Sequence, residues 1–110
     1  MNAKDNYGKA LRKIPKWAMN SHQINHKILK AFFQIESELG SVPYYVLKQR
    51  CNDKNKYPDI YVPTFKSNFD QMKIDNLKSH GKVFEITNDK VVLWAYTKET
   101  LLEYKNSFIL

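Results

Sequence analysis

Residues 83–94 read Val-Phe-Glu-Ile-Thr-Asn-Asp-Lys-Val-Val-Leu-Trp and contain two runs of strand-forming residues on either side of Asn88-Asp89. β-Branched and aromatic residues favour strands, and asparagine and aspartate tolerate the positive φ angles of a two-residue hairpin turn. The stretch therefore predicts a tight antiparallel hairpin with one apolar face that closes a core. The pairs expected across the hairpin are Ile86 with Val91, Phe84 with Leu93 and Val83 with Trp94.

A short amphipathic helix is expected just before the hairpin, over residues 64–75. Thr64 is a favourable N-cap, and Phe65, Phe69 and Met72 repeat at the spacing of one buried helix face. At about 100° per residue, the opposite side of this helix carries polar side chains of the kind that bind the edges of DNA bases. These side chains are Lys66, Ser67 and Gln71.

Two further helices are predicted upstream. The first begins at a Ser21 N-cap and ends at Gly40, and its apolar residues follow the spacing of a central core helix. Pro43 favours the start of a second helix over residues 44–51. Val42 is expected to add a small third strand to the hairpin.

The remaining segments are a loop and a C-terminal helix. Residues 52–63 are polar, contain two prolines and predict the loop, whereas Thr97 caps the predicted C-terminal helix. The chain ends in an apolar segment, residues 108–110, which would favour association if it were exposed. A homodimer through Trp94 and this C-terminal segment is therefore expected, with docking on the chain's own surface as the alternative.

Residues 1–20 are expected to form a basic arm ahead of a domain that spans residues 21–110. Seven basic residues and one acidic residue lie within residues 1–30, so this part carries most of the formal charge of +7. Such segments attract nucleic-acid backbones, because neutralised phosphates release their counterions. Pro15 is expected to prevent a long helix through Trp17, which would anchor the arm to the core.

The composition excludes several classes of protein. Cys51 is the single cysteine, so no intrachain disulfide can form and a reducing, cytoplasmic location is expected. No apolar run reaches the length of a membrane span, and no signal peptide or membrane partner is predicted. Hydrophobic residues make up 43% of the 110 residues, which is enough for one core that folds unaided.

Candidate metal ligands and catalytic carboxylates are sparse. His22, His26 and His80 lack the additional cysteine or carboxylate that would complete a zinc site. Pro58-Asp59 matches only the first half of the Pro-Asp…Asp/Glu-x-Lys nuclease pattern, because no lysine follows a downstream carboxylate at the required spacing. No metal, cofactor or catalytic residue is therefore assigned, and the chain is not expected to be an enzyme.

A small ribonuclease toxin is the enzymatic alternative. Toxins of this size cleave RNA with basic and aromatic side chains, and His80 with Lys78, Lys82 and Tyr96 would supply a base and a stabiliser of the phosphorane charge. Such toxins use a sheet of three or more strands, whereas the sequence here predicts only two clear strands.

From Ser21 to Tyr96, the order of three helices and a hairpin resembles a winged helix-turn-helix domain. The resemblance implies a mainly α fold with a small antiparallel hairpin (α+β), in which a three-helix core is followed by the wing and a C-terminal helix. It also implies that residues 64–74 are the recognition helix and residues 87–90 the wing tip. The loop over residues 52–63 is longer than the compact turn of this motif.

These observations predict sequence-dependent binding of double-stranded DNA by a small regulator or a DNA-docking component. Base contacts are expected from Lys66, Ser67 and Gln71. Contacts to the DNA backbone are expected from Lys9, Arg12, Lys13, Lys16, Lys73 and Lys90. Since winged helices also bind proteins, an interaction module of the same fold is the main alternative.

Overall fold

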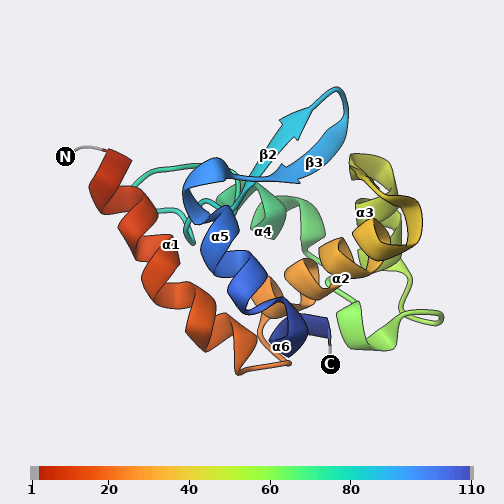
Figure 1. Cartoon of the computed structure of the whole chain (residues 1–110). Coiled ribbons are helices and arrows are strands. Elements are labelled where there is room, and N and C mark those ends of the chain that lie inside the picture. The colour runs from red at the N-terminus through yellow and green to blue at the C-terminus, as the bar shows by residue number, and fades with distance from the viewer. Residues whose placement is uncertain (1–2, 110) are drawn as a thin grey trace.

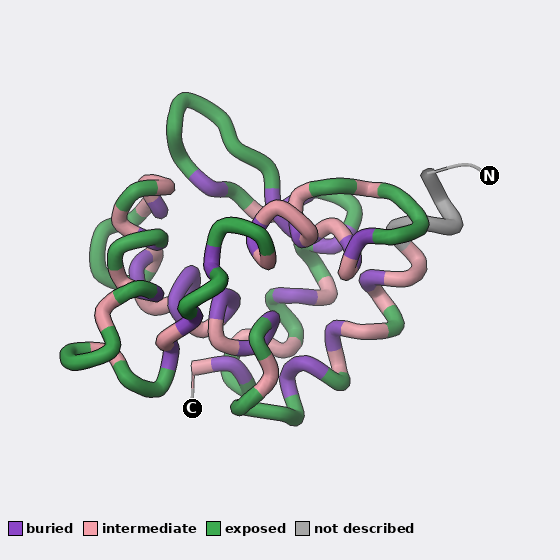
Figure 2. Tube along the Cα trace, turned by 180° about the vertical axis from the view of Figure 1, so that it is seen from behind, coloured by how far each residue is buried: buried purple, intermediate pink, exposed green. Residues whose placement is uncertain are grey.

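The computed structural model describes residues 3–109, with side chains placed for residues 8–109. This part of the chain is mainly helical and holds a small antiparallel sheet (Figure 1). Its strands lie in the order β1 (Val42–Pro43), β3 (Lys90–Leu93), β2 (Phe84–Thr87). The predicted α+β class is therefore confirmed. The hairpin of β2 and β3 extends beyond the body of the molecule, and its outer part is exposed (Figure 2).

The first helix, α1 (Ala3–Ala18), is unbroken although Pro15 lies inside it. The predicted interruption is therefore wrong. Pro15 lies in the last turn, where the one missing helical hydrogen bond is offset by burial of the apolar face around it. Trp17 is only 5% exposed and anchors the helix, as expected. Residues 3–18 of the predicted arm thus form a helix that packs on the domain, chiefly against α5 (Ala95–Glu103).

The central helix is α2 (Ile24–Leu39), and it contacts most of the other elements. It begins after the predicted Ser21 cap, because Gln23 takes the cap position and its side chain accepts a hydrogen bond from the His26 N–H. The predicted end at Gly40 is confirmed, with φ at 78°. Its largest buried side chains are Ile28, Leu29, Phe32, Phe33 and Ile35.

The short strand β1 (Val42–Pro43) pairs with β3, which confirms the expected third strand. It leads into α3 (Tyr44–Asn52), which matches the predicted second helix to within one residue. The predicted loop that follows contains the 3-10 turn η1 (Pro58–Ile60). Most of this loop is exposed, but Ile60 and Val62, each 1% exposed, anchor its second half to the core.

The predicted helix over residues 64–75 is shorter than expected. The structure has α4 (Phe65–Gln71), with Phe65, Phe69 and the following Met72 buried as predicted. The helix stops because the chain turns back and supplies N–H groups to its last carbonyls. His80 donates to the Gln71 carbonyl, and Val83 and Phe84 both donate to the Met72 carbonyl.

The predicted hairpin is confirmed as β2 (Phe84–Thr87) and β3 (Lys90–Leu93) in the expected register. Asn88 and Asp89 have φ angles of 52° and 62°, which is the geometry of a tight two-residue turn. Phe84 closes the core, with its ring 5.4 Å from that of Phe32 and 5.3 Å from that of Phe69.

The C-terminal segment forms α5 and α6 (Lys105–Ile109). Trp94, not Thr97, is the N-cap of α5, because Thr97 lies inside the helix and its hydroxyl donates to the Trp94 carbonyl. Phe108 is 1% exposed and packs against Phe33 and His26. Since Trp94 is also only 6% exposed, these side chains are covered within the chain, as the alternative of docking on its own surface predicts, and the homodimer stays a prediction. Leu110 lies outside the described residues.

Candidate nucleic-acid interface

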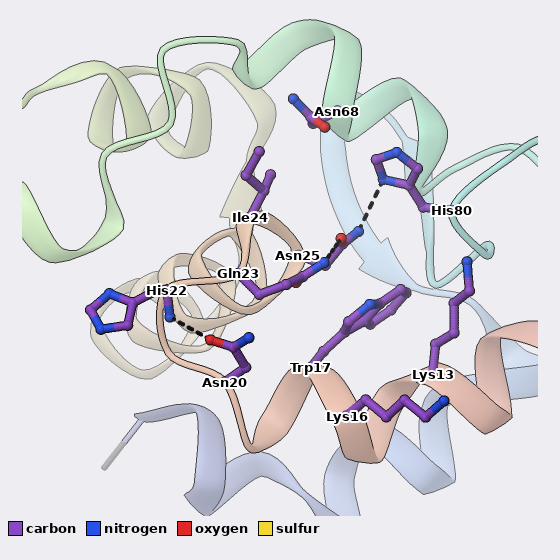
Figure 3. A pocket seen from close by; sticks show the side chains of 10 residues that line it. All are labelled: Lys13, Lys16, Trp17, Asn20, His22, Gln23, Ile24, Asn25, Asn68 and His80. Atoms are coloured by element: carbon purple, nitrogen blue, oxygen red, sulfur yellow. Dashed lines mark hydrogen bonds between the residues drawn. The ribbon is translucent and has the colours of Figure 1, made fainter.

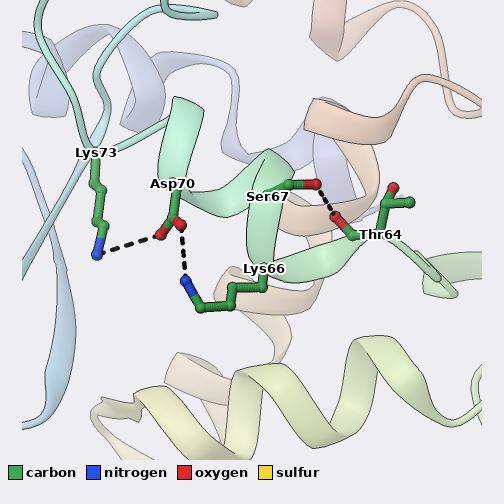
Figure 4. Close-up of polar contacts among 5 residues, drawn as sticks. All are labelled: Thr64, Lys66, Ser67, Asp70 and Lys73. Carbon is green, nitrogen blue, oxygen red and sulfur yellow. Dashed lines mark hydrogen bonds and ion pairs between the residues drawn. The ribbon is translucent and has the colours of Figure 1, made fainter.

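The polar side of α4 carries the predicted base contacts, and most of its groups have partners within the helix (Figure 4). The Lys66 ammonium lies 3.0 Å from one Asp70 carboxylate oxygen, and the Lys73 ammonium lies 3.3 Å from the other. The Ser67 hydroxyl donates to the Thr64 carbonyl at 3.2 Å. A nucleic acid would therefore have to compete with contacts inside α4 for these groups.

Gln71, the remaining predicted base contact, lies at the end of α4 and is half-buried. Its backbone carbonyl accepts the hydrogen bond from His80 N–H at 3.2 Å. Its position is thus fixed by the returning chain.

Lys9 has a role inside the fold that the sequence did not predict. Its ammonium donates to the carbonyls of Asn76, Leu77 and Ser79 at 2.9, 2.9 and 2.6 Å. Burial and the charge of Lys13 lower the pKa of Lys9. Lys9 therefore ties α1 to the segment that leads to the hairpin, and is not directed to solvent as a free backbone contact.

A cleft of about 750 Å³ opens between α1, the start of α2, α4 and His80 (Figure 3). The side chains of Lys13 and Lys16 reach it from α1, and Asn68 reaches it from α4. It is lined by Lys13, Lys16, Trp17, Asn20, His22, Gln23, Ile24, Asn25, Asn68 and His80. Since none of these lining residues is acidic, the cleft is a site of uncompensated positive charge.

His22 is exposed, whereas the other two histidines are partly or fully buried. His26 is 4% exposed and its Nδ1 lies 2.8 Å from the Trp17 carbonyl, while burial lowers its pKa. Burial also lowers the pKa of His80, and the charges of Lys13 and Lys9 lower it further. Within residues 8–109, no three histidine, cysteine or acidic side chains gather as a metal site.

The residues of the ribonuclease alternative do not all surround His80. The Lys82 ammonium bonds Glu85 at 3.1 Å and lies over the Trp94 ring, with 4.7 Å to its centroid. Tyr96 also contacts the Trp94 ring, with a centroid distance of 5.0 Å. Lys82 and Tyr96 are therefore held around Trp94.

The other flank of α4 is joined to the hairpin tip by Tyr44. The Tyr44 ring packs on Phe65 and Phe69 of α4, with centroid distances of 6.1 and 5.3 Å. The Tyr44 N–H donates to the Asp89 carbonyl in the hairpin turn at 2.9 Å. Lys90, next to this turn, is exposed.

These contacts place α4 between the cleft, which Lys13 and Lys16 line, and the hairpin tip, which carries the exposed Lys90 beside Asp89. We use the name basic arc for the predicted contact residues other than Lys9, which are Arg12, Lys13, Lys16, Lys66, Ser67, Gln71, Lys73 and Lys90; that they face one ligand is a prediction. Asn25 and Asn68 were missed, because nothing in their spacing distinguishes them from ordinary surface amides.

Comparisons with protein-family models, with curated proteins and with solved structures find no match to this chain. Within residues 3–109, no helix combines the length and the apolar character that crossing a bilayer requires.

Proposed function

We propose that this protein is a non-enzymatic, winged-helix-like DNA-binding protein that holds a duplex along the basic arc. The observation that carries the proposal is the position of α4, which is linked to the lysine-lined cleft through Asn68 and to the hairpin tip through Tyr44. A helix flanked by cationic groups on both sides matches what a duplex presents, a groove between two phosphate backbones.

Backbone contacts are expected to supply most of the affinity. In the described part of the chain, no ion pair involves Arg12, Lys13, Lys16 or Lys90. Their charges are therefore available to phosphates. Base readout by Lys66 and Ser67 is expected to be weaker, since both side chains already have partners within α4. Strong backbone contacts combined with weak base readout would suit a small regulator or a DNA-docking component.

The test is fluorescence-anisotropy titration of generic duplex DNA at several salt concentrations. About five phosphate contacts predict a slope of about −4.5 for log affinity against log salt. Changing Lys13→Gln or Lys90→Gln should reduce the steepness of that slope by about one each. Lys98→Gln is the matched control, because this exposed lysine lies on α5, outside the basic arc. No binding at low salt would contradict the proposal.

A protein-interaction module remains the second candidate, and one observation favours it. A hollow of about 410 Å³ lies beside the hairpin turn, lined by Pro43, Tyr44, Tyr45 and residues 88–90. Tyr45 is 64% exposed there, and exposed tyrosines are common in protein interfaces. If duplex binding fails, Tyr45→Ala should be the variant that weakens binding of a partner protein.

The ribonuclease alternative makes a separate prediction. Degradation of RNA without added metal, lost in His80→Gln, would support it over the DNA-binding proposal. If the purified protein leaves RNA uncleaved, the ribonuclease alternative is excluded.

A reducing compartment is the proposed location. Cys51 is fully buried, and burial raises the pKa of its thiol to about 12. A thiol in this state neither forms a disulfide readily nor needs an oxidising environment, which fits a cytoplasmic protein.

A further inference from the structure

The cleft contains a chain of hydrogen bonds that fixes the state of His80. It starts at the His26 backbone N–H, which donates to Gln23 Oε1 at 3.1 Å. Gln23 Nε2 then donates to Asn25 Oδ1 at 2.6 Å, and Asn25 Nδ2 lies 3.2 Å from His80 Nδ1. Because a backbone N–H can only donate, the direction of each later hydrogen bond follows from the first.

This chain determines which ring nitrogen of His80 carries the proton. His80 Nδ1 must accept from the Asn25 amide, so the neutral ring carries its hydrogen on Nε2. Among residues 8–109, no hydrogen bond uses His80 Nε2, and His80 lines the cleft (Figure 3). The fold thus presents a pre-oriented N–H donor at a cleft that also holds Lys13 and Lys16.

The donor and the two lysines define the chemistry of a ligand. An anion with several acceptor oxygens would use both ammonium groups and the His80 N–H, and a phosphate has these oxygens. The cleft volume of about 750 Å³ exceeds what a bare phosphate fills and is in the range of sites for organic ligands. Across the cleft from α1, Asn68 Oδ1 can accept a hydrogen bond, since Asn68 Nδ2 already donates to Thr64. The Ile24 side chain, 37% exposed, adds an apolar contact, and an acceptor beside an apolar surface suits a heterocyclic base.

We infer that this cleft binds a single nucleotide unit, with its phosphate among Lys13, Lys16 and His80 Nε2–H and its base toward Asn68 Oδ1 and Ile24. The unit is either a free nucleotide or the 5′-phosphorylated terminal nucleotide of a strand, since both present the same groups. This inference goes beyond duplex binding by the basic arc and does not need a duplex.

Imidazole NMR spectra test the inference directly, because the chain has only three histidines. Deoxyadenosine 5′-monophosphate should shift the His80 ring signals and raise the measured pKa of His80, because the phosphate favours the imidazolium. His26, which faces Trp17 and Phe108 inside the fold, should be unaffected. Lys13→Met and Lys16→Met should each weaken this binding about tenfold, whereas Lys98→Met should leave it unchanged.

Two further probes separate the parts of the ligand and its source. Deoxyadenosine without phosphate, and inorganic phosphate alone, should each bind far more weakly than the nucleotide. A short single strand with a 5′-phosphate should bind more tightly than the same strand without it if the source is a strand end. Equal binding of both strands, with tighter binding of the free nucleotide, would identify a free nucleotide as the ligand.

Three results would overturn the inference: unchanged His80 signals at saturating nucleotide concentration, equal effects of inorganic phosphate and the nucleotide, or equal weakening by Lys98→Met and Lys13→Met. Failure of nucleotide binding with duplex affinity intact would overturn this inference alone. Nucleotide binding by a protein that does not bind duplex DNA would overturn only the proposed function.

Discussion

At the scale of single residues, Lys9 and Gly81 determine how closely α1 approaches the segment before the hairpin. Lys9 donates to three carbonyls of that segment, one of which, that of Asn76, also accepts from the N–H and the hydroxyl of Ser79. Gly81 has φ at 124°, and a Cβ added there would lie 3.0 Å from the Ala10 Cα. Both the backbone angle and the contact with α1 therefore require glycine at this position.

Gly81→Ala should be markedly destabilising. The unfavourable φ contributes about 1–3 kcal/mol, and the forced displacement of α1 adds about 1–3 kcal/mol. Gly40→Ala is the matched control, because Gly40 also has a positive φ of 78° but open space around its Cα. It should lower the free energy of unfolding by only about 1–2 kcal/mol. Urea denaturation of both variants measures the difference, and equal losses would contradict the close approach of α1.

At the scale of elements, α4 was predictable only in part from the sequence pattern. Its buried residues were predictable, because Phe65, Phe69 and Met72 have helical spacing. Its end was not, because the groups that terminate it come from His80 and Val83, which follow a turn of irregular sequence. The register of the hairpin was predictable, since it depends only on a local two-residue turn. The burial of its apolar face was not, because Phe84 closes the core but Ile86 is 40% exposed.

In α1 the prediction from the sequence was wrong for a different reason: proline was expected to interrupt the helix. Pro15 is a helix breaker in isolation, but packing of Ile14 and Trp17 stabilises the continuous helix in the folded chain. In the candidate site, Lys13 and Lys16 were predictable from the concentration of charge. The inward role of Lys9 and the participation of Asn25 were not, because both depend on contacts between distant segments.

Asp70 offers a test of the role of α4. Asp70→Asn removes the carboxylate that holds Lys66 and Lys73, and it removes a negative charge that faces the proposed duplex. Duplex affinity should rise by about 1 kcal/mol, or roughly fivefold. The free energy of unfolding should change by less than about 1 kcal/mol, since exposed ion pairs contribute little. Anisotropy titration measures the affinity, and an unchanged or weaker affinity would place α4 away from the DNA.

At the scale of the whole molecule, the N-terminal and C-terminal helices are both joined to the core through His26. Its Nδ1–H donates to the Trp17 carbonyl of α1, and its ring packs 5.2 Å from the Phe108 ring of α6. This arrangement fixes α1, and with it one half of the basic arc, relative to α4. The stability of the fold and the geometry of the proposed interface should therefore depend on the same buried imidazole.

Stability should fall as the pH decreases. Burial lowers the pKa of His26 in the folded chain, so the unfolded chain takes up the proton first. The contribution of neutral His26 is complete above the unfolded pKa of about 6.5 and is lost as the pH falls below it. Thermal unfolding between about pH 8 and about pH 5 should show this decrease in Tm.

His26→Gln should have a lower Tm but a flatter dependence on pH. His22→Gln is the control, because His22 is exposed and should leave the profile unchanged. His80, whose pKa is lowered in the same direction, should account for most of the dependence that remains in His26→Gln. A profile as steep in His26→Gln as in the natural chain would exclude His26 as the main titrating group.

The central claim is that the cleft, α4 and the hairpin tip face one ligand, and chemical-shift mapping of the amide signals tests it most directly. A duplex of about two helical turns should be added to the isotope-labelled protein at low salt. We predict that the affected amides cluster in residues 12–17 of α1, in α4 and at residues 87–90. Shifts confined to α3 and η1, or an absence of shifts, would contradict the account.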